Sequence, residues 1–140
     1  MLQTNVEIVR SVYVALNLGD WDGVFRDTHP EMTLTTQRGL NAGTKLGRED
    51  VQGFLEDYRR AFDKVVWDPE ELHETAERVV VVVTTRGRPQ GSDAEIVNRN
   101  GHIWTIRHGK ILSLQTFPDS DKALEAAGLA GRSDDGDRAG

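Results

Sequence analysis

The feature that most constrains the fold is a β-hairpin pattern centred on His108-Gly109, a dipeptide suited to a two-residue turn. The segments before and after it both show the alternating residue pattern of a β-strand. Pairing Arg107 with Lys110 sets the register of the two strands. On one face this register pairs Ile106 with Ile111, Trp104 with Ser113 and His102 with Gln115; on the other it pairs Thr105 with Leu112 and Ile103 with Leu114. Both faces carry apolar residues. We therefore expect one face to line a pocket and the other to pack on helices or on a partner.

Composition excludes several classes of protein. A chain of 140 residues with a net charge of −6 is expected to form one soluble domain and lacks the basic stripe that nucleic-acid binding needs. There is no cysteine, so no disulfide or thiolate site is expected. The longest apolar run covers only residues 79–83, and the N-terminus lacks the pattern of a signal peptide. We expect a cytoplasmic protein without a membrane partner.

Apolar residues at helical spacing predict three helices in the first half of the chain. The first starts at a cap on Thr4 or Asn5 and ends at Gly19. The second covers residues 21–27 and is ended by His29-Pro30, because a residue before proline avoids the helical conformation. The third runs from residue 48 or 49 to about residue 63.

Strand patterns cover most of the second half. Strands are predicted over residues 31–38, 65–75, 78–87, 94–108 and 110–117. Pro69 implies an edge position or a bulge, and the unbroken run 79–83 implies a strand buried on both faces. Residues 39–47 are Gly-rich and are expected to form a flexible connection or a lid; residues 121–127 predict a last short helix. The order of elements indicates an α+β domain over residues 1–130 with a curved, mostly antiparallel sheet, followed by a disordered tail over residues 131–140.

Five sequence pieces, spread in order over roughly residues 5–129, carry a family resemblance: LNLGDWDGVF, HPEMTL, LGREDVQGFLEDYRRAF, RHGKILSLQTFPD and ALEAAGL. Together they resemble the SnoaL-like branch of the nuclear transport factor 2-like superfamily. The resemblance implies a cone-shaped, cystatin-like α+β fold, with the sheet wrapped around the N-terminal helices, a pocket inside the cone and a homodimer through the sheet. Relatives include polyketide cyclases, ketosteroid isomerases, limonene epoxide hydrolases, dehydratases and non-catalytic members, so the fold alone does not decide the function.

Ketosteroid isomerase offers the strictest test of the resemblance, because its chemistry needs an aspartate base, a tyrosine and a protonated aspartic acid. In this sequence the tyrosine position falls on Val12, the base position on Thr36 and the acid position on Gly101 or His102. Tyr13 is one residue away from the tyrosine position, and a difference of one residue turns a helical side chain by about 100° around the helix axis. We therefore expect Tyr13 to be a poor substitute and this isomerisation to be absent.

The candidate catalytic residues are His102, Asp68 and Tyr58. His102 could act as a general base in a pocket beside Trp104, since imidazole titrates near neutral pH; alternatively, it faces a dimer partner and bonds to Gln115. Asp68 would be a base only if it were buried, and is otherwise solvated. Tyr58 belongs to the core or presents its hydroxyl group to a ligand.

The candidate ligand-binding residues of the hairpin are Trp104, Leu114 and Ile103. Those from elsewhere in the chain are the aromatic Phe62 and the polar Arg86 and His29. Arg86 could bind an acidic group of the ligand or pair with a neighbouring strand. His29 could point into the cavity mouth or cap the second helix. The histidines lack the spacing of a metal site, so neither a metal nor another cofactor is expected.

Two hypotheses about function follow. In the first, the protein binds a small apolar or polycyclic metabolite and either sequesters it or performs cofactor-free acid–base chemistry of the cyclase, isomerase or hydrolase type. In the second, it is a non-catalytic dimeric module that binds a ligand or another protein. The first is the leading hypothesis, and the missing carboxylate pair at the family positions is the observation that points to the second.

Overall fold

The computed structural model describes residues 4–36 and 43–129. Three helices precede most of the strands: α1 (Asn5–Leu18), α2 (Trp21–Val24) and α3 (Arg48–Arg60). Helix α1 begins with a capping box, in which the Thr4 hydroxyl oxygen accepts from the backbone N–H of Glu7 and the Glu7 side chain accepts from that of Thr4. It ends at Gly19, which has a left-handed conformation with φ of 72°. Both predicted ends of this helix are confirmed.

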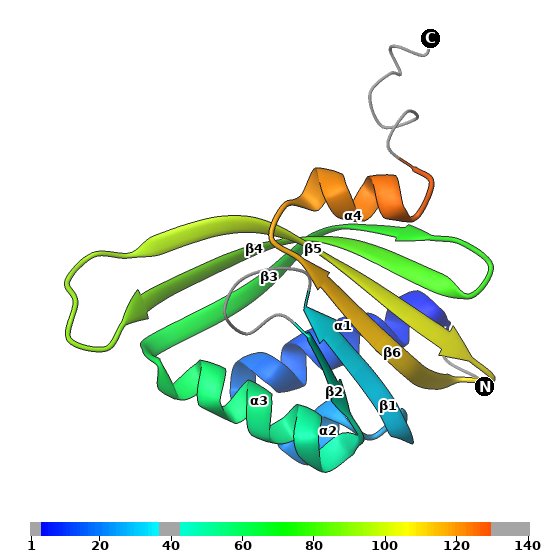
Figure 1. The fold of residues 1–140 in the computed structure, drawn as a ribbon, viewed down its shortest axis with the longest axis horizontal. Helices are drawn as coiled ribbons and strands as arrows, with labels where there is room; N and C mark the ends of the chain where they lie inside the picture. The colour runs from blue at the N-terminus through cyan, green and yellow to red at the C-terminus, as the bar shows by residue number, and fades with distance from the viewer. Residues whose placement is uncertain (1–3, 37–42, 130–140) are drawn as a thin grey trace, which may run out of the picture.

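Six strands form one sheet in the order β2-β1-β6-β5-β4-β3. Their bounds are Thr28–Thr36 (β1), Gly43–Leu46 (β2), Phe62–Glu74 (β3), Arg78–Pro89 (β4), Ile96–Arg107 (β5) and Lys110–Phe117 (β6). Every neighbouring pair is antiparallel except β1 and β6. The sheet is strongly curved, with α1 and α3 on its concave side and α4 (Ser120–Ala126) on its other side (Figure 1). The predicted single-domain α+β fold is confirmed.

The two faces of β4 belong to two separate apolar clusters. Val79, Val81 and Val83 face the larger cluster, which holds α1 against the concave side of the sheet. Val80 faces the smaller cluster with Ile103 and with the Leu124 side chain of α4. All five valines of residues 79–83 are at most 1% exposed, as their uninterrupted pattern predicted.

Helix α4 lies close to the sheet because Gly101 has no side chain. A Cβ atom at this position would overlap the Cβ of Ala123 and press on the backbone of Ser120. On the concave side, Asn17 of α1 holds edge strand β3 through two hydrogen bonds of 2.8 Å to the backbone N–H and C=O of Trp67. These contacts fix the helices on both faces of the sheet.

The predicted hairpin register is correct at the turn and wrong beyond it. Ile106 pairs with Ile111 as expected, but a bulge follows, and Leu112 is the extra residue. Trp104 therefore pairs with Leu114 instead of Ser113, and His102 pairs with Thr116 instead of Gln115. The bulge brings Leu114 to the same face as Trp104 and His102.

Other boundaries also differ from the prediction. The second helix ends at Val24, and His29-Pro30 lies inside β1 and does not end the helix. Part of the predicted Gly-rich connection forms strand β2 (Gly43–Leu46), which pairs with β1. The rest of that connection, residues 39–42, and the predicted tail, residues 131–140, lie outside the described residues. The expectation for Pro69 is confirmed, since β3 is an edge strand and its register shifts between Pro69 and Glu71.

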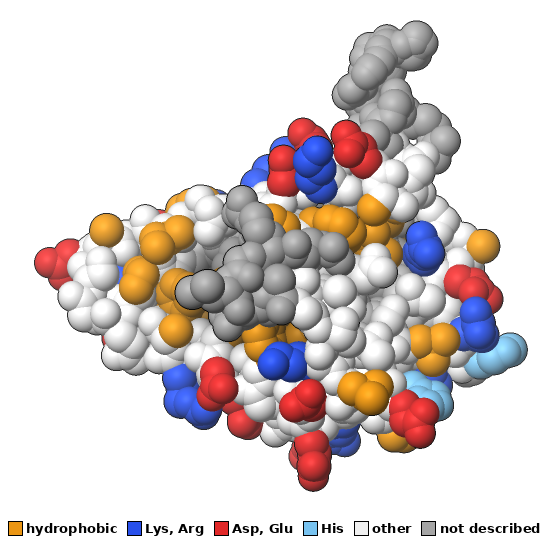
Figure 2. All heavy atoms as spheres, viewed as in Figure 1, with side chains coloured by type: hydrophobic (Ala, Val, Ile, Leu, Met, Phe, Trp, Pro, Cys, Tyr) orange, Lys and Arg blue, Asp and Glu red, His pale blue; other side chains and the backbone are white. Residues whose placement is uncertain are grey.

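Charged side chains of both signs are scattered across the face shown in Figure 2. Within the described ranges, no helix is both long and apolar enough to cross a lipid bilayer.

Candidate functional site

A cavity of about 350 Å³ lies between the concave face of the sheet and the three N-terminal helices. Helices α1, α2 and α3 contribute mainly aliphatic and aromatic side chains to its wall, among them Leu16, Val24 and Phe54. Strands β1, β3, β4, β5 and β6 contribute the opposite wall. None of the described residues that line the cavity is an aspartate, glutamate, lysine or arginine. The cavity is large enough for a molecule of two or three rings and offers it an uncharged environment.

Three buried side chains of the wall form a hydrogen-bonded cluster. The Tyr13 hydroxyl oxygen lies 2.6 Å from Nδ1 of His102 and accepts a 3.0 Å hydrogen bond from Nε1–H of Trp104. Tyr13 is 1% exposed, Trp104 5% and His102 8%. The Tyr13 and His102 rings lie parallel with centroids 5.9 Å apart, and the Trp104 ring meets the Tyr13 ring at 81°. We call these three residues the Tyr13 cluster.

The direction of the hydrogen bonds in the Tyr13 cluster follows from the chemistry of its groups. Trp104 can only donate, so one lone pair of the Tyr13 oxygen is occupied by its N–H. If His102 also donated to that oxygen, the Tyr13 proton would have no acceptor among the described residues. The satisfied arrangement has the Tyr13 hydroxyl donating to Nδ1 of His102. The imidazole then carries its proton on Nε2.

Burial keeps both titratable members of the cluster uncharged near neutral pH. It lowers the pKa of His102 to about 4, because the charged imidazolium loses its hydration. It also raises the pKa of Tyr13 far above its ordinary value, although the hydrogen bond from Trp104 opposes this effect. Nε2–H of His102 has no protein partner among the described residues and belongs to a side chain of the cavity wall. It is therefore a neutral donor available to a bound molecule.

Four of the nine predicted site residues line the cavity. His102 and Trp104 do so from the concave face of β5, and the bulge places Leu114 of β6 on the same face. Tyr58 lines it from α3 and is 37% exposed; its ring contacts Trp67, with centroids 5.7 Å apart, and partial burial raises the pKa of its hydroxyl.

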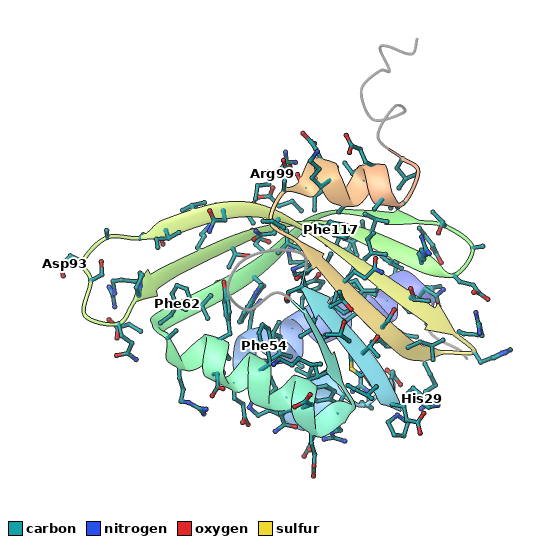
Figure 3. The ribbon with its side chains drawn as sticks, viewed as in Figure 1. His29, Phe54, Phe62, Asp93, Arg99 and Phe117 are labelled. Carbon is teal, nitrogen blue, oxygen red and sulfur yellow. The ribbon has the colours of Figure 1, made fainter. Side chains whose placement is uncertain are left out.

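Two apolar candidates lie elsewhere, which corrects the prediction. Ile103 points to the opposite face of β5 and packs under α4, because neighbouring residues of a strand alternate between faces. Phe62 lies at the start of β3 (Figure 3). It packs against Tyr58 with ring centroids 5.3 Å apart. It lines a shallow surface groove beside α3, outside the cavity.

The three polar candidates Asp68, Arg86 and His29 are all exposed and outside the cavity. Asp68 follows the buried Trp67 on β3 and so points to the convex face, where Arg86 also lies on β4. His29 sits near the start of β1, away from the cavity, and its Nδ1 accepts from the backbone N–H of Glu31 at 3.0 Å (Figure 3). No group of three His, Asp or Glu side chains suitable for a metal ion occurs in the described parts of the chain.

Sequence reasoning missed Tyr13. Counting from Gly19-Asp20 assigned the pocket position to Val12, yet Val12 and Tyr13 both line the cavity. The available signal was a tyrosine within the apolar stripe of α1, since a buried tyrosine needs a partner for its hydroxyl group.

A family model described as the SnoaL-like domain matches residues 9–114. The chain belongs to this family. No curated protein matches it significantly.

Solved structures of similar fold agree with the assignment. An NTF2-like protein of unknown function from Burkholderia pseudomallei K96243 is 23% identical, with a TM-score of 0.77, over 89% of this chain and 97% of that one. TerC, co-crystallised with polyporic acid, is 24% identical, with a TM-score of 0.75, over 90% and 97% of the two chains. A protein with a ketosteroid isomerase-like fold from Catenulispora acidiphila DSM 44928, in complex with trimethylamine, is 17% identical, with a TM-score of 0.74, over 90% and 95%. At these identities the likeness concerns the fold.

Proposed function

We propose that this SnoaL-like protein binds an uncharged, largely apolar small molecule in its cavity and holds it by a hydrogen bond from Nε2–H of His102. The observation that carries the proposal is the neutral Tyr13 cluster in a wall without charged side chains. A carbonyl or ether oxygen of the ligand would accept this hydrogen bond. The apolar walls supply affinity through burial of the ligand rings.

His102 is better suited to donate a hydrogen bond than to abstract a proton. Its Nδ1 is occupied by Tyr13, and burial lowers its pKa to about 4, far below that of an effective base at neutral pH. Asp68, the other predicted base, is exposed on the convex face. We therefore favour binding or sequestration over acid–base catalysis by these residues.

Two of the similar structures support a ligand-binding role. TerC was co-crystallised with polyporic acid, and the Catenulispora protein is in complex with trimethylamine. In both cases a small molecule accompanies a protein of this fold.

Calorimetric titration with two matched ring compounds tests the proposal. We expect 1-tetralone, a neutral ketone, to bind and the anion 1-naphthoate to be excluded, because moving a charge into an apolar cavity is costly. His102→Phe should weaken 1-tetralone binding about tenfold, as expected for loss of one hydrogen bond. His108→Asn, in the exposed hairpin turn, is the matched control and should leave binding unchanged. Failure of the wild-type protein to bind any neutral ring compound would refute the proposal.

The homodimer through the sheet and the cytoplasmic location remain predictions. Helix α4 already covers part of the convex face, over Val80 and Ile103. A second copy would therefore contact a part of that face that α4 leaves uncovered. Light scattering coupled to size-exclusion chromatography measures the mass of the particle directly and decides between monomer and dimer.

A further inference from the structure

Five of the polar side chains of the cavity lie side by side on the sheet. Thr36, Thr116 and His102 form one row across the neighbouring strands β1, β6 and β5. Asn100 lies two residues before His102 on the same face of β5, and Thr85 of β4 lies next to it. We call these five residues the polar band. It crosses four strands of the concave face.

Three groups of the polar band can donate to a ligand. The first is Nε2–H of His102, and the second is the Thr116 hydroxyl, which has no hydrogen-bond partner among the described residues. The third is the Asn100 amide, whose Oδ1 accepts from the Thr85 hydroxyl at 2.8 Å and whose Nδ2 donates to the carbonyl oxygen of Pro118 at 3.3 Å. One N–H of that amide remains for a ligand.

Strand geometry fixes the spacing of these donors. Residues that pair across antiparallel strands have Cβ atoms about 5 Å apart, which applies to His102 and Thr116. Residues two apart along a strand are separated by about 7 Å, which applies to His102 and Asn100. A rigid ligand could therefore meet two of the donors at the same time.

Among the described lining residues on the helix side, only Tyr13 and Tyr58 carry a polar group. There the helices present Val12, Leu16, Val24, Val51, Phe54 and Leu55. The Tyr13 hydroxyl is occupied within its cluster. A bound molecule would place its polar edge against the sheet and its apolar edge against the helices.

We propose that the polar band selects a flat ring molecule with two acceptor oxygens, one bound by His102 and the other by Thr116 or Asn100. This inference rests on the proposed function and adds to it the number and placement of the polar atoms of the ligand. In this assignment Thr116 and Asn100 determine specificity, and Thr85 positions the Asn100 amide.

Titration with naphthalene and 1,4-naphthoquinone tests the assignment, since the two compounds share a ring system and differ by two carbonyl oxygens. The chain has no cysteine that the quinone could alkylate. We expect the quinone to bind about tenfold more tightly than naphthalene. Thr116→Val and Asn100→Leu should each reduce this preference severalfold while naphthalene binding stays the same.

Thr33→Val is the matched control, because Thr33 lies on β1 next to Ser113 of β6 and does not line the cavity. It should leave both affinities unchanged. If naphthalene binds but the two oxygens add no affinity, or if neither variant changes the preference, the polar band does not select the ligand and only this inference fails. If neither compound binds, the proposed function fails with it.

Discussion

At the scale of single residues, the Tyr13 cluster explains how polar atoms are tolerated in an apolar interior. Trp104 donates to Tyr13, and Tyr13 donates to His102, so each buried polar atom of the contact has a partner. The arrangement depends on all three side chains. Changing one of them leaves another without its partner.

Tyr13→Phe should therefore destabilise the protein by about 1–3 kcal/mol, because Nε1–H of Trp104 and Nδ1 of His102 would be buried without partners. Urea unfolding measures the change. Tyr58→Phe is the control, since the Tyr58 hydroxyl makes no hydrogen bond to the described residues, and it should change the free energy of unfolding by a few tenths of a kcal/mol. Equal effects of the two variants would contradict the role of the Tyr13 hydroxyl.

The buried imidazole also predicts a pH dependence of stability. His102 takes up a proton near pH 6.5 when unfolded and near pH 4 when folded, so the unfolded state binds more protons between these values. Stability should fall as pH falls through this window, by roughly 3 kcal/mol in total.

Urea unfolding at several pH values between 7 and 4 measures this loss. In His102→Phe the slope due to this group should disappear, whereas His108→Asn should retain it. Parallel curves for the wild-type protein and His102→Phe would show that another group causes the pH dependence.

The sequence did not reveal the Tyr13 cluster because its members come from helix α1 and strand β5, far apart in the chain. Counting along α1 identified one wall position, but the cavity is lined by Val12, Tyr13 and Leu16, an arc of about 100° around the helix. A side chain one position further along the helix, such as Tyr13 after Val12, therefore still points into the cavity. His102 was found because a titratable side chain within an apolar strand pattern is visible without knowledge of its partner.

At the scale of elements, the close contact between α4 and β5 depends on Gly101. A side chain there would meet Ala123 and the backbone of Ser120. Helix α4 covers Val80 and Ile103, so lifting it would expose the smaller apolar cluster. The sequence predicted the helix but not the face on which it packs.

Gly101→Ala should destabilise the protein by about 1–3 kcal/mol through overpacking. Adding Ala123→Gly removes the Cβ atom that the new methyl group meets and should restore part of the loss. Thermal unfolding of the single and double variants measures both effects. If the double variant were no more stable than Gly101→Ala alone, the contact with Ala123 would not be the cause.

At the scale of the whole molecule, the order of elements and the family pieces were enough to predict the fold, because both report on long segments. The presence of a cavity followed from apolar residues on both faces of the hairpin. The face that lines it did not follow, because the bulge at Leu112 exchanges the two faces of β6 relative to a regular hairpin.

Filling the cavity should separate ligand binding from folding. Leu55 lines the hollow from α3 and is only partly buried. Leu55→Trp should abolish binding of naphthalene-sized compounds while the melting temperature stays equal or rises, since the larger side chain occupies otherwise unfilled apolar space. Calorimetry and thermal unfolding check the two parts, and retained ligand affinity would place the ligand elsewhere.

The extra residue in the hairpin has a consequence for how such a site can diverge. With Leu112 deleted, Ser113 would follow Ile111 directly, the ladder would become regular, and Leu114 and Thr116 would still face inward. With Leu112 kept but the ladder made regular, Ser113 and Gln115 would face inward in their place. Loss of the bulge without loss of a residue is therefore enough to replace Leu114 and Thr116 by the more hydrophilic Ser113 and Gln115 in the wall, whereas deletion of Leu112 leaves the wall unchanged.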